Sequence, residues 1–190
     1  MSGGIALGEI APLAVTLVYE THSTTEDNEA GIATGWRPGR LSPAGRAQAA
    51  GLGLRRREDG LAAVFVSDLA RAVETAAIAF AGSPLPVLRD RRLRECDYGV
   101  LTGCPAERLA AVRARHVDRP FPGGQSYRQV AEAMAGVLRD LKAGWDGARV
   151  LVIAHSANLW ALEHLLAGAR LEDLLQAPPP WQPGWTYVVP

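Results

Sequence analysis

Short runs of β-branched residues alternate along this sequence with longer stretches rich in alanine, leucine and arginine. This alternation is typical of strands interleaved with helices, and it predicts a three-layer α/β/α sandwich around a mostly parallel sheet. The segments expected to form strands span residues 15–19, 63–66, 86–88, 149–154 and 185–189. The segments expected to form helices span residues 42–58, 69–80, 105–115, 126–143 and a last stretch from about 157 towards a proline stop at 178–180.

The chain has the length of one domain and offers no boundary within it. Its 190 residues, 48% of them hydrophobic, can bury about two-thirds of their unfolded surface around a single core. No internal repeat, low-complexity tract or long linker divides the sequence. We therefore expect a single domain over residues 1–190, with residues 1–13 as a flexible or loosely packed N-terminal segment.

The charges balance, with 20 basic and 20 acidic side chains. Nucleic acids and anionic membranes are bound through a surplus of positive charge, so we expect neither as a partner. No apolar run approaches the ~18 residues of a membrane span, and no basic n-region opens the chain. Cys96 and Cys104 are too few for a disulfide framework, which favours free thiols and a cytoplasmic protein. The sequence leaves a homodimer open.

Two of the expected strands end in the same way, each followed by a histidine and a serine. His22 comes after the first strand and His155 after the strand at 149–154. Side chains past the carboxyl ends of parallel strands face one crevice, so the two rings could share a pocket. Arg71 lies in the first turn of the helix after a third strand, where its guanidinium and the helix amides favour an anion such as phosphate. Taken singly, each histidine is more simply explained by strand-end hydrogen bonds, and Arg71 by a solvated helix surface.

The segment around the first histidine resembles the opening signature of the phosphoglycerate-mutase-like histidine phosphatases. Residues 17–28 read LVYETHSTTEDN, beside the family's L-V-R-H-G-E-T-x-x-N. Five further blocks follow in the family's order: LSPAGRAQA at 41–49, SDLARAVETA at 67–76, LRECDYG at 93–99, PGGQS at 122–126 and VIAHS at 152–156. They are similar to the family's L-T-x-x-G-x-x-Q-A, S-D-L-x-R-A-x-x-T-A, L-x-E-x-x-x-G, P-G-G-E-S and V-x-S-H-G. Six blocks over about residues 15–165 make a specific match, which implies the phosphoglycerate-mutase-like fold without a large inserted cap.

The resemblance implies a chemical role for four residues. His22 would attack phosphorus as a neutral imidazole and form a phosphohistidine, provided that a backbone carbonyl holds its other ring nitrogen. Arg71 and His155 would hold the phosphoryl oxygens, whose charge must be matched in a loose transition state. Glu95 would protonate the leaving alkoxide and then activate water, which requires a raised pKa. Without the resemblance, Glu95 is better explained as a surface carboxylate paired with a neighbouring arginine.

The same comparison implies four substrate-binding residues, Thr21, Ser23, Asn28 and Ser156, and neither a metal nor a cofactor. The expected partner is a small phosphorylated or otherwise anionic molecule. The expected activity is metal-independent hydrolysis of a phosphomonoester. A phosphomutase is the alternative among enzymes, but the segment from 95 to 124 is short and a mutase must exclude water. A catalytically silent ligand-binding protein of the same fold is the alternative outside enzymes.

The sequence departs from the family pattern at four positions. Thr21 stands where the pattern has arginine, Ser23 replaces glycine, Thr24 replaces glutamate, and Gln125 replaces the glutamate of the P-G-G-E-S block. Losing one guanidinium from a phosphate site removes a charge-assisted contact, at a cost of about 3 kcal/mol in catalysis. The loss has three possible explanations: another arginine takes the place, a less charged substrate undergoes an altered reaction, or turnover has been lost.

Candidates for a replacement arginine are Arg37, Arg40 and Arg94, because they lie on loops that the family folds over the pocket. Glu20 occupies a normally apolar strand position and shares a strand face with His22. A buried carboxylate requires a cation, so we predict an arginine partner beside Glu20.

Two further groups receive a structural interpretation. The helix at 105–115 carries Arg108, Arg113 and Arg115, which are expected on a solvated face, with a basic rim that steers anions as the alternative. Trp181 and Trp185 flank a turn rich in proline and glycine and are expected to cover the core rather than to bind a ligand.

Overall fold

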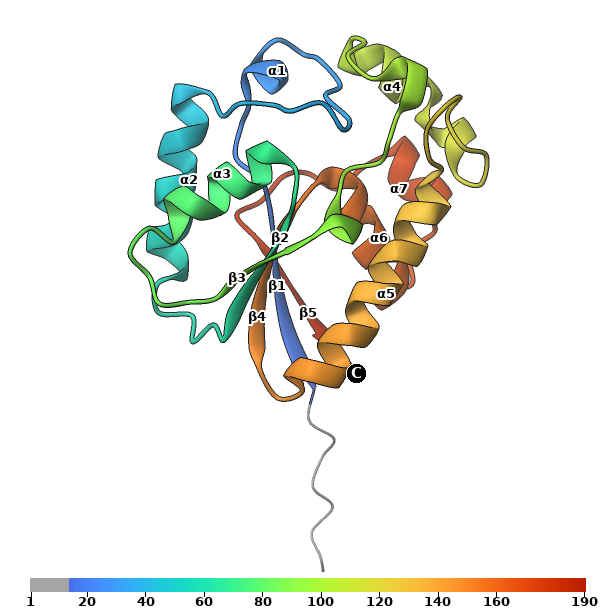
Figure 1. Cartoon of the computed structure of the whole chain (residues 1–190). Helices are drawn as coiled ribbons and strands as arrows, with labels where there is room; N and C mark the ends of the chain where they lie inside the picture. Colours follow the sequence, from blue (N-terminus) through green and yellow to red (C-terminus); the bar gives the residue numbers. More distant parts are fainter. Residues whose placement is uncertain (1–13) are drawn as a thin grey trace, which may run out of the picture.

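A computed structural model describes residues 14–190, and the expectation for residues 1–13 lies outside the described part. Five strands form one sheet in the order β3-β2-β4-β1-β5. Figure 1 shows helices on both faces of this sheet. The predicted three-layer α/β/α arrangement is confirmed.

The strands coincide closely with the predicted segments. They are β1 (Val15–Thr21), β2 (Ala63–Ser67), β3 (Val87–Asp90), β4 (Arg149–Ala154) and β5 (Trp185–Val189). β4 pairs in parallel with β1 and with β2, and β2 pairs in parallel with β3. β5 runs antiparallel to β1 at the sheet edge. The sheet is therefore mostly parallel, and the carboxyl ends of β1, β2 and β4 lie at one edge.

Seven α-helices occur in residues 14–190. They are α1 (Glu26–Glu29), α2 (Pro43–Arg56), α3 (Ala70–Ala79), α4 (Ala106–Val112), α5 (Tyr127–Trp145), α6 (Ser156–Ala167) and α7 (Leu171–Gln176). In Figure 1, α2 and α3 cover one face of the sheet, α5 and α6 cover the other, and α1 and α4 lie beyond the carboxyl ends of the strands. The candidate site lies between the sheet and the helices α1 and α4.

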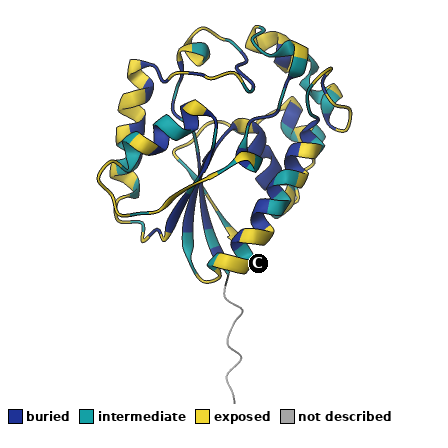
Figure 2. Cartoon of the chain, in the orientation of Figure 1, coloured by how far each residue is buried: buried dark blue, intermediate teal, exposed yellow. Residues whose placement is uncertain are grey.

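Buried residues gather on the strands and on the inward sides of the helices, as Figure 2 shows. Val18 packs in one apolar cluster with Leu52 of α2 and Ala72 of α3. Its neighbour Tyr19 belongs to a second cluster, which includes Met134 of α5. Side chains on a strand alternate between faces, so β1 directs its even-numbered residues towards α2 and α3.

Local breaks in the helices differ from the sequence expectation. The helix expected from about residue 157 is divided into two helices, α6 and α7. Gly168 caps the end of α6 with a φ of 73°, a left-handed conformation that glycine adopts readily. The short α1 was not predicted. Thr25 caps it by accepting a hydrogen bond from the amide of Asn28, whose side chain accepts one from the amide of Thr25 in return.

Cys96 and Cys104 are free thiols, as expected. Cys96 is buried, and burial raises the pKa of its thiol, which therefore stays protonated at neutral pH. Over residues 14–190, no helix combines the length and the apolar character needed to cross a membrane.

Candidate active site

Side chains from three neighbouring strand ends meet at the carboxyl edge of the sheet. The ring centroids of His22, after β1, and His155, after β4, lie 5.0 Å apart at an interplanar angle of 58°. Arg71 comes from α3, which follows β2, and its Nε donates to Nε2 of His22 over 3.2 Å. The predicted meeting of two imidazoles with one guanidinium is confirmed.

The hydrogen bonds of His22 fix which ring nitrogen carries the proton. Its Nδ1 lies 2.8 Å from the carbonyl oxygen of Ser23, which can only accept, so Nδ1 is the protonated nitrogen. Nε2 therefore keeps its lone pair and accepts from Arg71. Burial, together with the adjacent positive charge of Arg71, lowers the pKa of His22 to about 3. His22 is thus a neutral imidazole at physiological pH, with the tautomer that a nucleophile requires.

Arg71 is a buried cation whose hydrogen-bond partners are uncharged. Only 2% of its surface is exposed. Nη2 donates to the carbonyl oxygen of Gly35 at 2.8 Å, and Nη1 donates to that of Arg37 at 3.2 Å. A desolvated charge without a direct counter-charge is costly, so an anion at this position would be strongly favoured.

Glu95 lies on the loop that follows a 3-10 turn at Arg91–Leu93. The indole Nε1 of Trp36 donates to the carbonyl oxygen of Glu95 at 2.6 Å, and the amide of Cys96 donates to its Oε1 at 2.7 Å. Burial raises the pKa of Glu95, and the hydrogen bond from Cys96 and the charge of Arg71 only partly oppose this shift. Glu95 therefore holds a proton at higher pH than an exposed glutamate does.

His155 lies within the wall of the site, fully buried. Its Nε2 is 2.8 Å from the hydroxyl oxygen of Ser67, and the hydroxyl of Tyr19 donates to its carbonyl oxygen at 2.5 Å. Burial, with the charges of Arg71 and His22 adding to it, places the pKa of His155 well below its ordinary value. His155 lines neither cavity, so the structure does not show the expected contact of His155 with the phosphoryl oxygens; its neutral ring lies beside His22 on the buried side.

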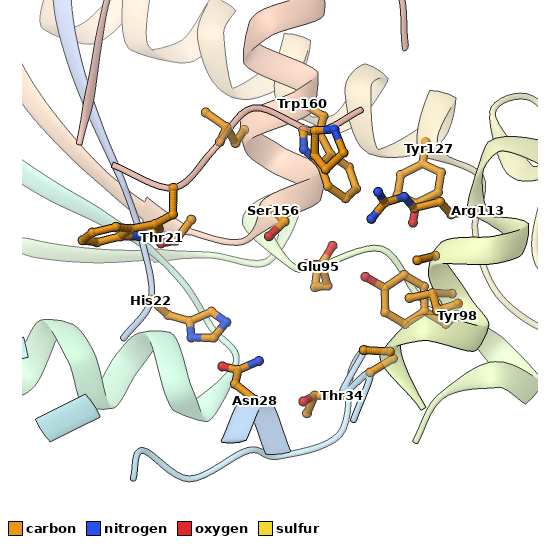
Figure 3. Close-up of a pocket in the computed structure, with 18 of the residues that line it drawn as sticks. Thr21, His22, Asn28, Thr34, Glu95, Tyr98, Arg113, Tyr127, Ser156 and Trp160 are labelled. Carbon is orange, nitrogen blue, oxygen red and sulfur yellow. The ribbon is translucent and has the colours of Figure 1, made fainter. Parts of the chain in front are cut away.

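Two cavities meet at His22. The first, about 370 Å³, includes Glu95 and Arg71 in its wall and is called the Glu95 cavity below. The second, about 360 Å³, includes Arg55 and is called the Arg55 cavity. Five residues line both: Thr21, His22, Asn28, Ser156 and Trp181. Figure 3 shows the ring of His22 directed into the Glu95 cavity, with Glu95 and Ser156 across from it and Trp160 and Arg113 beyond.

Three of the four predicted substrate-binding residues line both cavities. Asn28 accepts from the amide of Thr25 through its Oδ1, so its NH₂ group is free to donate beside His22 (Figure 3). Ser156 is the first residue of α6 and is exposed, in a position where the helix amides favour an anion. Ser23 differs, because it lines only the Arg55 cavity. Its carbonyl oxygen accepts the hydrogen bond from Nδ1 of His22.

None of the three arginines proposed as substitutes for the missing motif arginine lines either cavity in the described part of the chain. Arg94 forms a two-contact ion pair with Asp68, at 2.7 Å for each contact. Arg37 offers its carbonyl to Arg71, while its guanidinium lies against Gly103. Arg40 contributes its carbonyl to the amide of Glu26. Thr21 itself lines both cavities, and Arg55 is the arginine that lines the Arg55 cavity together with it.

The prediction of an arginine beside Glu20 is confirmed. Glu20 is 2% exposed, and Arg56 of α2 contacts its Oε1 through Nε at 3.0 Å and through Nη2 at 2.7 Å. Arg55 approaches the same carboxylate more loosely, at 3.3 Å, with its side chain 40% exposed. Arg56 also pairs with Asp59 at 3.0 Å. The carboxylate at this unusual strand position is therefore neutralised by α2.

Two residues of the Glu95 cavity were assigned other roles from the sequence. Arg113 was expected on a solvated face but is half-buried in the cavity wall, with its guanidinium 5.1 Å from the ring centroid of Trp160. Trp181 was expected to cover the core but is 70% exposed and lines both cavities. The turn at Arg113–His116 moves Arg113 out of the regular helix pattern, so periodicity could not locate it. Trp185 packs edge-on against Tyr19, which agrees with the expected covering role.

The described part of the chain contains no group of three histidine, cysteine, aspartate or glutamate side chains arranged to hold a metal ion. The polar groups around His22 are instead a guanidinium, an amide, hydroxyls and a helix N-terminus. These groups donate hydrogen bonds, so the arrangement suits an oxyanion.

The sequence profile of the histidine phosphatase superfamily (branch 1) matches residues 21–181. A 2,3-bisphosphoglycerate-dependent phosphoglycerate mutase of Methylobacterium radiotolerans is 37% identical over 176 residues, which cover 83% of each chain. The solved structure of Bacillus stearothermophilus YhfR is similar with a TM-score of 0.76 and 28% identity, over 87% of this chain and 86% of that one. A mycobacterial glucosyl-3-phosphoglycerate phosphatase in complex with VO3 gives 0.74 and 26% identity, over 84% and 85%.

Proposed function

Because the chain belongs to the histidine phosphatase superfamily, branch 1, we propose that it hydrolyses a small-molecule phosphomonoester through a phosphohistidine at His22. The observation that carries this proposal is the state of His22, with Nδ1–H held by the carbonyl of Ser23 and the lone pair of Nε2 beside Arg71. The family contains phosphatases and mutases, so an enzyme of phosphoryl transfer is supported by the relatives. The choice of hydrolysis rests on the site.

In the first step, the hydrogen bond from Nε of Arg71 to Nε2 of His22 is broken and that N–H turns to a phosphoryl oxygen. The freed lone pair of Nε2 then attacks phosphorus while the bond from phosphorus to the ester oxygen breaks. Glu95 gives its proton to the departing oxygen, which leaves as an alcohol. Arg71 and the NH₂ of Asn28 hold the phosphoryl oxygens during the transfer, with the hydroxyl of Ser156 and the amides at the start of α6 beside them. His155 keeps His22 in place from the buried side.

In the second step, the carboxylate of Glu95 takes a proton from water as the water oxygen attacks phosphorus. The bond from phosphorus to Nε2 breaks, its electron pair returns to His22, and inorganic phosphate leaves. Glu95 is protonated again at the end of the cycle. The raised pKa of Glu95 suits both of its roles, because a group that donates and then accepts must titrate near the working pH.

Access of water favours hydrolysis over mutase action. Ser156 and Trp181 are exposed where they line the cavities, so water reaches the phosphohistidine. A mutase must keep water away from this intermediate until the phosphoryl group returns to substrate. The sequence relatives named as phosphoglycerate mutases keep the mutase as the second candidate.

The site holds phosphate with fewer charges than the family motif provides. Thr21 replaces the motif arginine, and Arg71 is the guanidinium beside His22. The missing charge-assisted contact corresponds to about a hundredfold in rate. We therefore expect slow turnover, and this expectation belongs to the proposal.

The test is release of inorganic phosphate from a panel of phosphomonoesters, measured with and without EDTA. We expect release by the wild-type protein, a loss of at least about a thousandfold in His22→Ala, and no change in His164→Ala, which alters a histidine outside both cavities. Release that survives His22→Ala, or that disappears with EDTA, would contradict the mechanism.

Two further readouts separate the alternatives. Conversion of 3-phosphoglycerate into 2-phosphoglycerate, without net phosphate release, would assign the mutase. Vanadate binding without turnover of any ester would assign a ligand-binding protein of the same fold.

A further inference from the structure

Tryptophan is concentrated in the wall of the Glu95 cavity. The chain has five tryptophans, and Trp160, Trp181 and Trp185 all line this one cavity. Pro178 and Pro179 line it as well. This part of the wall is therefore aromatic and apolar, whereas Arg71, Asn28 and Ser156 make the wall beside His22 polar.

The three indoles are not equivalent. Trp160 is 6% exposed and packs against Tyr127 and under the guanidinium of Arg113. Trp185 and Tyr19 pack in an edge-to-face arrangement, with ring centroids 6.2 Å apart. Trp181 is 70% exposed, and no aromatic ring or cation of the described residues lies against it. Trp181 is therefore the most exposed of the three indoles, and it lines both cavities.

The segment that carries Trp181 is restricted by its prolines and contacts Arg56. Prolines at 178–180 and 183 restrict its backbone dihedrals. Nη2 of Arg56 donates to the carbonyl oxygen of Pro183 at 3.3 Å, in addition to its ion pair with Glu20. Gly184, with φ 94°, has this guanidinium in the space that a Cβ would fill. Arg56, through its ion pair with the buried Glu20, thus connects the segment to β1, two residues before His22.

We propose that the substrate is a phosphate ester of a ring-bearing alcohol, and that the ring stacks on Trp181 while its phosphoryl group lies beside His22. This inference rests on the proposed function and names its substrate class. A fixed indole offers a large contact face at little cost in conformational entropy, and aromatic rings and the apolar faces of sugar rings both stack on such a face. Arg113, at the far end of the cavity, meets the polar rim of the ring.

The experiment compares three esters: phenyl phosphate with an aromatic ring, glucose 6-phosphate with a sugar ring, and glycerol 3-phosphate without a ring. For each ester, kcat/KM is measured in the wild-type protein and in Trp181→Ala and Trp181→Phe. Val188→Ala is the control, because Val188 is a 63% exposed apolar residue of β5 outside both cavities. Comparing each variant with wild type for one ester at a time removes the difference in leaving-group chemistry.

We expect Trp181→Ala to lower kcat/KM about tenfold or more for at least one ring-bearing ester and less than about twofold for glycerol 3-phosphate. Trp181→Phe, which keeps an aromatic face, should recover most of the loss, and Val188→Ala should change nothing. The ester with the larger effect identifies the ring as aromatic or sugar. An equal loss for all three esters, or no loss for either ring-bearing ester, would overturn the proposal.

A binding measurement separates this inference from the hydrolase assignment. Calorimetric titration of phenyl phosphate and glucose 6-phosphate into His22→Ala, with and without Trp181→Ala, needs no turnover. A ring-dependent loss of affinity of about tenfold supports the stacking face even if no ester is hydrolysed. Equal affinity with and without the indole refutes it, whatever the hydrolysis assay shows.

Discussion

Two arginines near the nucleophile carry their charges in different ways: Arg71 is buried, and Arg56 is partly buried with its side chain 14% exposed. In the Glu95 cavity, the hydrogen bonds of Arg71 go to His22 and to two carbonyl oxygens. On the side of the Arg55 cavity, Arg56 is neutralised by Glu20 and Asp59. The first arrangement leaves a positive charge for a ligand, whereas the second satisfies its charge within the protein. The low exposure of an arginine therefore does not identify its role, whereas the charge of its partners does.

The comparison also explains what the departure from the family motif does. A glutamate precedes Thr21, where the motif arginine is missing, and the arginines closest to this glutamate belong to α2. Their charge holds β1 to α2 and to the segment bearing Trp181, instead of contacting phosphate. We infer that catalysis depends on Arg71 and that stability depends on Glu20 with Arg56.

The largest expected effect is that of Arg71→Gln. Removal of the uncompensated guanidinium should lower kcat/KM by about a thousandfold, because charge in the transition state loses its principal donor. The same variant should bind vanadate much more weakly, and the thermal unfolding midpoint should not fall. Steady-state kinetics and vanadate titration measure these quantities. A loss of less than about tenfold would contradict the role assigned to Arg71.

Glu95→Gln should lower kcat by about a hundredfold, because neither the proton transfer to the leaving oxygen nor the activation of water can occur. The wild-type rate should fall as pH rises through the raised pKa of Glu95, since the first step uses its protonated form. His22 reacts as the neutral base, so its protonation should reduce the rate only as pH approaches about 3. A pH profile of kcat/KM for glycerol 3-phosphate tests both limbs. An alkaline descent that persists unchanged in Glu95→Gln would contradict this assignment.

Glu20→Gln tests whether the ion pair of Glu20 with Arg56 contributes to stability rather than to catalysis. Removing one charge of a buried pair leaves Arg56 with a weaker partner, and we expect a loss of about 2 kcal/mol in the free energy of unfolding. Urea denaturation measures this loss. The kcat of the remaining folded protein should fall far less than in Arg71→Gln, and the opposite ranking of the two variants would break the comparison.

Arg55→Ala has the smallest expected effect. Arg55 is the more exposed and the more weakly bonded of the two arginines at Glu20. We expect its removal to cost under about 1 kcal/mol in stability and to change kcat/KM by less than about threefold. A loss of about a hundredfold in kcat/KM, with unchanged stability, would instead show that Arg55 replaces the missing motif arginine.

The sequence predicted the layers and the strand ends well because these depend on local patterns. Strand segments before His22 and His155 have strong β-branched character, and parallel pairing brings their carboxyl ends together. The capping signal at Ser42 and Pro43 likewise places the start of α2. The antiparallel direction of β5 and the break at Gly168 were not predicted, because chain reversal near the end depends on how the last segment meets the sheet.

The parts of the site that sequence reasoning missed depend on tertiary position. Arg37 and Arg113 are arginines near the site, yet the first faces it with its carbonyl and the second with its guanidinium. Residue type alone cannot distinguish these cases. Trp181 shows the same limit, because its place in the walls of both cavities depends on how the last segment of the chain packs against elements that are far away in the sequence.

The most direct test of the central claim is detection of the covalent intermediate. The protein is mixed with an ester that carries labelled phosphate and quenched within milliseconds into alkaline denaturant, in which phosphohistidine survives, and the labelled peptide is identified by mass spectrometry. We expect the label on the peptide that contains His22, no label in His22→Ala, and increased label in Glu95→Gln with an activated aryl ester, because breakdown by water is slowed. Hydrolysis that proceeds at the wild-type rate without label on His22, or with label on another residue, would contradict the account.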